Sequence, residues 1–388
     1  MIIKYLSLLI ILFGCSELKK NNEPDGLKKI SVGFTESSKD ISSLYSNEIE
    51  FIPLQISEEA LSSSTEKIYC NDEYILISDK KMGYILMYDW EGKYLKKIGE
   101  IGRGPNQYIS LCDFTVINDD ILIKDEFQSN IITYSIKEDI INRIKLPFDT
   151  NCDNIFYLNE KLYFINNYGR VNEKFFNLVS WNITDDIVEF MLPYDSDIYI
   201  NERFWGLINY YSIYNEETLI ILANNDTIYS LEKNEISAKY KLSFGKNYVP
   251  ADILKNKNGM EIFDYSIKND YTLGLESIHH TDKLILGDIG KGEKCYTLIY
   301  NKQTEETVTS TNLVLSKFGD LPLTIKNMTI FGNDLILSYD ALFFKEMCDL
   351  KIINIERIKD KEVREAFIRA YDSIQDDSNQ LLIKIKAL

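Results

Sequence analysis

Two Cys-Asp pairs are the residues of this 388-residue chain whose types and spacing best suit chemistry. Cys112-Asp113 and Cys152-Asp153 lie about 40 residues apart, each before an apolar stretch typical of a strand. If equivalent strands line one channel, both carboxylates converge on one opening, where oxygen ligands hold hard cations such as calcium. The alternative is that Asp113 and Asp153 cap strands or are solvated. No cofactor is predicted, and calcium is an open option at Asp113, Asp153 and His279.

The two histidines limit the catalytic possibilities. His279 and His280 are adjacent, so on a strand they point to opposite faces. A three-histidine zinc site is excluded, and a Ser-His-Asp triad would need one of these two residues in a chain that lacks a GxSxG motif. Sixty acidic residues make chance carboxylate pairs inevitable, so no glycosidase pair is assigned. No catalytic residue is predicted.

A cluster of aromatic residues with arginine suggests a binding surface. Arg203, Trp205 and Tyr210 lie in one long connection between apolar segments. Exposed aromatic rings beside arginine would suit a sugar or a peptide, whereas the alternative is packing between structural units. The formal charge of −17 argues against nucleic acid as a ligand.

The N-terminus is typical of export. Lys4 precedes a short apolar run that ends in Gly14-Cys15, and the run is far below the roughly 20 residues needed to span a bilayer. This arrangement resembles a bacterial lipoprotein signal. It predicts a signal peptide over residues 1–14, lipidation of Cys15, a tether over 15–48 and one folded domain over 49–388. A plain signal peptide or an apolar strand is the alternative.

Repeated segments predict the elements that would position these residues. An apolar strand ending in an aromatic residue recurs at Tyr88, Tyr134, Trp181 and Tyr229, in steps of about 46 to 48 residues. A turn of Asn, Asp or Glu followed by a short apolar strand occurs six times. The six copies begin at Asn71, Asn118, Asn159, Asn215, Thr281 and Gly332. Asn and Asp suit such turns because they tolerate left-handed backbone. Six copies predict six blades of a β-propeller, an all-β fold.

The remaining segments complete this architecture. Residues 245–270 form an insertion between repeats, and apolar residues at helical spacing predict a short amphipathic helix over 359–375. Residues 381–388 form a last strand. The unpaired apolar segment 49–54 is expected to join the C-terminal blade and close the ring, because closure removes two exposed sheet edges.

One motif resembles a known family. Residues 98–108 read Ile-Gly-Glu-Ile-Gly-Arg-Gly-Pro-Asn-Gln-Tyr, which is similar to the Gly-x-Gly-Pro-Gly-Glu-Tyr signature of six-bladed β-propeller lipoproteins of Gram-negative bacteria, related to NHL and TolB-like propellers. Asn106 and Gln107 depart from the usual Gly-Glu. The resemblance implies the fold and export without implying an activity. Arg103 and Tyr108 either brace this loop or lie at a channel mouth, where Arg103 would donate to a ligand.

The function hypotheses follow from this scaffold. The first is a non-catalytic binding or scaffolding propeller, lipid-anchored to the outer membrane on its periplasmic or outer face, that recognises a glycan, a peptide or a partner protein. The second is a metal-dependent lyase or hydrolase that uses the central channel. The third is a structural subunit of an envelope complex.

Overall fold

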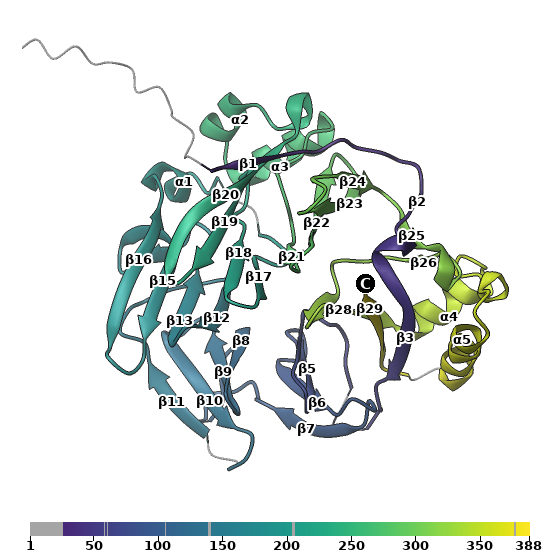
Figure 1. The fold of residues 1–388 in the computed structure, drawn as a ribbon. Helices are drawn as coiled ribbons and strands as arrows, with labels where there is room; N and C mark the ends of the chain where they lie inside the picture. The colour runs from purple at the N-terminus through teal and green to yellow at the C-terminus, as the bar shows by residue number, and fades with distance from the viewer. Residues whose placement is uncertain are drawn as a thin grey trace, which may run out of the picture.

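A computed structural model describes residues 26–388, except for positions 58, 60, 105, 139–140, 204–205 and 376–377. The predicted signal peptide and Cys15 therefore lie outside the described residues. The described chain is mostly β, and its sheets are arranged around a common centre (Figure 1). None of the helices described is long and apolar enough to cross a membrane.

Six sheets contain four or more strands, and each is built mainly from consecutive antiparallel strands. The first contains β4 (Lys67–Cys70), β5 (Ile75–Asp79), β6 (Tyr84–Tyr88) and β7 (Tyr94–Ile98). The second contains β8 (Leu111–Ile117), β9 (Asp120–Asp125), β10 (Asn130–Ser135) and β11 (Ile141–Lys145). The third contains β12 (Asn154–Leu158), β13 (Lys161–Ile165), β14 (Arg170–Val171), β15 (Lys174–Asn182) and β16 (Ile187–Pro193).

The remaining sheets combine strands from distant parts of the chain. The fourth contains β17 (Tyr211–Tyr214), β18 (Glu217–Ile220), β19 (Thr227–Glu232), β20 (Glu235–Ser243) and β1 (Lys28–Ser31). The fifth contains β21 (His279–His280), β22 (Leu284–Lys291), β23 (Lys294–Asn301) and β24 (Thr307–Ser310). The sixth contains β27 (Met328–Phe331), β28 (Asp334–Asp340), β29 (Gln380–Ala387) and β3 (Tyr45–Pro53). A small sheet contains β2 (Lys39–Asp40), β25 (Leu313–Leu315) and β26 (Leu321–Pro322).

The core lies between neighbouring sheets rather than within one of them. In one cluster, Leu122 of β9 packs with Phe164 of β13 and Trp181 of β15. A strand buried on both faces needs a nearly continuous run of apolar residues, and β5 is buried at all five of its positions. The arrangement is β-propeller-like, because antiparallel sheets radiate from a centre and pack face to face.

The predicted turn chemistry is observed. Asn118, Asn159 and Asn215 have φ values of 55°, 47° and 54° at the turns between the first two strands of their sheets. This is the left-handed region that asparagine tolerates better than most residues.

The N-terminal segment corrects one prediction. Residues 15–48 were expected to form a tether, yet within the described part β1 pairs in parallel with β20, and β2 pairs in parallel with β25. Thr35 bridges Ser310 between them. Figure 1 shows this segment running along the outside of the fourth and fifth sheets to the small sheet at β25. We call residues 28–44 the belt. It supplies partners to outer strands that would otherwise have free edges, so the folded domain begins before residue 49.

The predicted strand pairing and the predicted helical segments are observed. The segment 49–54 falls largely within β3, which pairs with β29, as expected. Helix α5 (Lys361–Ser373) occupies the predicted helical segment, and α2 (Ala251–Asn256) and α3 (Gly259–Lys268) form the predicted insertion. Two further helices, α1 (Ser196–Ile200) and α4 (Ala341–Asp349), were not predicted, and α4 buries Phe344 and Met347.

Candidate functional site

The first strands of the six sheets begin at the same end of the molecule, which we call the mouth end. Side chains at the starts of β4, β8, β12 and β17 meet there, since Lys67, Asp113, Asn154 and Tyr211 form one hydrogen-bonded cluster. Because consecutive strands are antiparallel, the second strand of each sheet finishes at the mouth end. Connections between second and third strands, and between one sheet and the next, therefore lie there too.

Asp113 is the most heavily bonded of the predicted site residues. Its side chain is 2% exposed and accepts a hydrogen bond from the Lys67 ammonium at 2.9 Å. It also accepts from the Asn154 amide and the Ile155 backbone N–H, both at 2.9 Å, and from the Phe114 N–H at 2.8 Å. A buried carboxylate is stable only when it is paired and hydrogen-bonded, and Asp113 meets both conditions within the protein.

Lys67 is the cation of this cluster, and it was not among the predicted site residues. Besides Asp113, it donates to the Tyr211 hydroxyl at 2.8 Å and lies 4.9 Å from the centre of the Phe114 ring. Burial lowers the pKa of Lys67, but the charge of Asp113 and the contact with Tyr211 outweigh burial and raise it overall. The cluster joins four sheets at the centre of the molecule. The signal that could have found it is its position, because Lys67 is the first residue of β4, the strand equivalent to β8.

Asp153 and Tyr210, which come directly before β12 and β17, are brought together. The Tyr210 side chain is 5% exposed, and its hydroxyl hydrogen-bonds to Asp153. The same hydroxyl accepts from the Leu207 N–H at 3.0 Å and from the Asn167 amide at 3.3 Å. Burial raises the pKa of Asp153, partly offset by Tyr210. Asp113 and Asp153 thus have separate sets of partners.

The two cysteines of the Cys-Asp pairs pack between the second and third sheets. Both are buried, and the Cys112 thiol donates to the Cys152 carbonyl at 2.8 Å. Among the described residues, no group of three or more His, Cys, Asp or Glu side chains is arranged to hold a metal ion.

The two candidate residues of the glycine-rich motif, Tyr108 and Arg103, differ in burial. Tyr108 is completely buried, and its hydroxyl donates to the Gly83 carbonyl at 2.7 Å. Gly99, with a φ of 88°, leaves the space that Tyr108 occupies, because an added Cβ would lie 2.2 Å from that hydroxyl. Tyr108 therefore braces the loop, whereas Arg103 is exposed on it.

The other candidates lie around the same end. His279 is 7% exposed, and burial lowers its pKa to about 4, against a smaller opposing effect of a hydrogen bond to the Ile325 backbone. The imidazole is therefore neutral near pH 7. The Arg203 backbone is fixed by bonds to Ile198 and Asn224, while Trp205 lies outside the described residues.

Exposed apolar side chains gather on the connections of the mouth end. Of the seventeen exposed large apolar side chains among the described residues, thirteen belong to these connections, and Phe127 is the most exposed of them together with Ile200, at 68% each. The thirteen are Leu61, Met82, Ile101, Ile109, Phe127, Ile200, Ile208, Met260, Leu342, Phe343, Leu350, Ile352 and Ile368. The other four are Leu95, Ile187, Ile213 and Leu388. We call the thirteen the apolar rim.

The fold and the central cluster define a mostly β, propeller-like protein with one distinctive end. Comparison with protein families adds that residues 29–386 match the Domain of unknown function (DUF4934), and the chain belongs to this family. No curated protein matches the sequence.

The chain is also similar to solved structures. The Putative exported protein BF0058 of Bacteroides fragilis NCTC 9343 is 18% identical, with a TM-score of 0.71 over 93% of this chain and 100% of that one. A member of the duf4221 family from Bacteroides vulgatus ATCC 8482 is 13% identical, with a TM-score of 0.49 over 88% and 97%. Virginiamycin B lyase from Staphylococcus aureus is 13% identical, with a TM-score of 0.42 over 74% and 81%. At these identities the similarity to BF0058 concerns the fold alone.

Proposed function

We propose that this protein is an exported, lipid-anchored six-bladed β-propeller that binds a partner protein through its mouth end and does not catalyse a reaction. The apolar rim is the observation that carries this proposal. Exposed apolar side chains on connections that share one end of a molecule can supply the apolar part of an interaction site, and a protein interface combines such apolar contacts with a polar surround. At the mouth end, the Lys67 ammonium and the Asp113 carboxylate neutralise each other and share a hydrogen bond.

Among the three ligand classes expected from the sequence, a partner protein suits this surface best. The rim is mostly aliphatic, with Phe127 and Phe343 as its two aromatic members. Sugars are commonly held by aromatic faces with hydrogen-bonding groups beside them, whereas aliphatic side chains distributed over many loops match an extended protein surface.

The six-blade assignment is supported by six sheets of four or more strands and by the pairing of β3 with β29, which links the two ends of the domain. An experimental density map tests it directly. Six sheets closing around the Lys67–Asp113 cluster are expected, and an additional blade or an open ring would contradict the proposal.

Export and anchoring rest on the N-terminal sequence and on the description of BF0058. Stable anchoring needs more than one acyl chain. The lipidated cysteine of a bacterial lipoprotein carries more than one, so lipidation of Cys15 predicts a membrane-bound protein. We expect metabolic labelling with an alkyne fatty acid to tag the full chain in a Gram-negative host, and Cys15→Ala to abolish the tag. An equally labelled Cys15→Ala variant would contradict lipidation at this residue.

Site-specific photo-crosslinking in the source bacterium tests the docking surface. We expect a photoreactive phenylalanine analogue at Phe127 or Ile101 to capture one defined protein, identified by mass spectrometry. Matched positions outside the rim, Leu95 and Ile187, have similar exposure to Ile101 and should not capture it. Capture at the control positions but not at the rim would overturn the proposal.

A further inference from the structure

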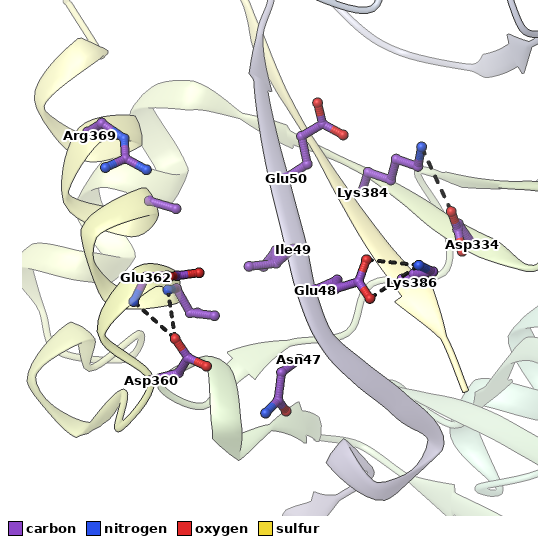
Figure 2. A pocket seen from close by; sticks show the side chains of 12 residues that line it. Asn47, Glu48, Ile49, Glu50, Asp334, Asp360, Glu362, Arg369, Lys384 and Lys386 are labelled. Atoms are coloured by element: carbon purple, nitrogen blue, oxygen red, sulfur yellow. Dashed lines mark hydrogen bonds and ion pairs between the residues drawn. The ribbon is translucent and has the colours of Figure 1, made fainter.

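The groove along β3 holds charges that are paired within the sixth sheet. It has a volume of about 620 Å³ and runs beside α5 (Figure 2). Glu48 of β3 pairs with Lys386 of β29 at 2.9 Å, and Asp334 of β28 lies 3.8 Å from Lys384 of β29. These contacts link neighbouring strands, so the charged side chains serve the sheet itself. A pair of buried thiols at another junction between sheets carries a reactivity that the described contacts do not use.

Cys112 and Cys152 lie where the second and third sheets meet. Cys112 is in β8, and Cys152 lies two residues before β12. The two residues are 5% and 3% exposed and belong to the apolar cluster that contains Leu122 and Phe164. β8 and β12 are the first strands of their sheets. A bond between these cysteines would therefore join two successive sheets near the mouth end.

The two thiols are in contact. The Cys112 thiol donates to the Cys152 carbonyl at 2.8 Å, and it also hydrogen-bonds to the Cys152 side chain. A thiol is a weak donor, so exchanging these hydrogen bonds for a covalent bond costs little. A disulfide requires closely spaced Cβ atoms whose side chains point towards each other. Side chains that already touch need only a change of rotamer to satisfy this requirement.

The other described cysteines lie in other parts of the fold. Cys70 ends β4 of the first sheet, Cys295 is in β23 of the fifth sheet, and Cys348 is in α4. Between residues 111 and 193, which span the second and third sheets, the sequence contains Cys112 and Cys152 and no other cysteine. The fold therefore favours one pairing over the alternatives.

We propose that Cys112 and Cys152 form a disulfide that fastens the second sheet to the third. This inference rests on the exported location proposed above, because disulfides form and persist in oxidising compartments. The oxidant is a disulfide of another molecule, supplied by a thiol–disulfide oxidoreductase in the cell and by oxidised glutathione in the test below.

The reaction consists of two successive thiol–disulfide exchanges. The thiolate of one cysteine attacks a sulfur of the oxidant, breaks its S–S bond and forms a mixed disulfide, which releases one thiolate. The thiolate of the other cysteine attacks the protein sulfur of the mixed disulfide, forms the Cys112–Cys152 bond and releases the second thiolate. The two cysteines lose two electrons and two protons, and the oxidant gains both and becomes two thiols.

The bond is expected to form during folding. In the folded protein, contact with Cys152 and burial raise the pKa of the Cys112 thiol well above its ordinary value, which leaves little of the reactive thiolate. A large oxidant cannot reach either buried sulfur. Oxidation therefore precedes the packing of the second sheet against the third, and the same packing then shields the bond from reductants.

Refolding in a glutathione buffer tests the pairing independently of export. The full chain carrying Cys15→Ala, which retains the five described cysteines, is unfolded in urea and refolded with oxidised and reduced glutathione. Remaining thiols are alkylated, and the protein is digested without reduction for mass spectrometry. We expect one dominant pair of cross-linked peptides, which contains Cys112 and Cys152. Cys152→Ser should lose this pair, and Cys348→Ala, the matched control, should retain it.

Thermal unfolding measures what the bond contributes. A disulfide constrains the unfolded chain, so protein refolded with glutathione should have a Tm at least about 4 °C above that of protein refolded with dithiothreitol. Cys152→Ser should show no such difference between the two treatments. An equal Tm for the two forms of the unsubstituted pair would contradict the fastening role.

Two further results would overturn the proposal: absence of the Cys112–Cys152 peptide pair after refolding, or its formation no more often than pairs with Cys70, Cys295 or Cys348. The chain exported by its own N-terminal segment in a Gram-negative host, with thiols alkylated at lysis, should carry the same bond. A bond that forms in glutathione but is absent from these cells would contradict the proposed export rather than the pairing.

Discussion

Asp113 was predicted as a possible calcium ligand, and in the structure it pairs with Lys67 in the central cluster. Asp113 was placed at the centre by the repeat spacing, and the structure does place it there, next to Asn154 and Tyr211. Its partner, Lys67, was not predicted, because the sequence does not state which side chains face each other across the centre. Which side chains face each other across the centre depends on how far each strand extends before it turns.

Removing Asp113 tests the energetic role of this cluster. Asp113→Ala leaves the Lys67 ammonium without its counter-ion, and breaking such a buried pair typically costs about 3 kcal/mol. We expect a loss of that order in the free energy of unfolding, measured by urea denaturation. Asp119→Ala, in an exposed ion pair with Lys137, should change stability little. Equal stability of the two variants would contradict a structural role for the Asp113 pair.

His279 gives the fold a dependence on pH. Its pKa falls from 6.5 to about 4 on folding because the ring is buried. The unfolded chain therefore takes up a proton first as the pH falls, and the stability contributed by neutral His279 is complete above pH 6.5 and lost progressively towards pH 4. The difference between the two pKa values corresponds to about 3 kcal/mol of folding stability. His279→Gln should reduce the slope of stability against pH in that range, and an unchanged slope would contradict the assignment.

At the scale of elements, periodic segments were predictable and short ones were not. Helix α5 has a regular apolar face with Val363 and Phe367, and the hairpins repeat the same aromatic signal, so both were predicted. The belt escaped because β1 has four residues and β2 has two. Neither is long enough to show a period. Their strand conformation is imposed by the outer edges of β20 and β25, which the local sequence does not reveal.

The belt is expected to stabilise the fourth sheet through Ile30, which is 1% exposed and packs with Leu219 and Tyr240. Ile30→Ala should destabilise the protein by about 2 to 4 kcal/mol, from lost burial and the cavity left behind. Hydrogen exchange should show faster exchange in β20, while β11, which the belt does not contact, serves as the internal control. Unchanged exchange in β20 would show that the belt is not held by this contact.

At the scale of the whole molecule, the long connections between strands lie at one end, and the proposed docking surface lies there for that reason. Insertions such as α2, α3 and α4 all follow strands that finish at the mouth end, and the opposite end has short turns such as that at Asn118. The sequence placed Asp113 and Asp153 at one end, since the repeat register puts the starts of equivalent strands together. The apolar rim was not predicted, because single exposed apolar residues in separate loops form a surface only after folding.

Hydrogen-exchange mass spectrometry of the full chain, with and without the protein captured at Phe127, tests the central claim most directly. The docking proposal predicts protection of the connections that carry the rim, including residues 80–83, 100–110 and 126–129, with the turns at Asn118 and Asn159 unchanged. Protection confined to those opposite turns, or no protection at any rim connection under saturating partner, would contradict it.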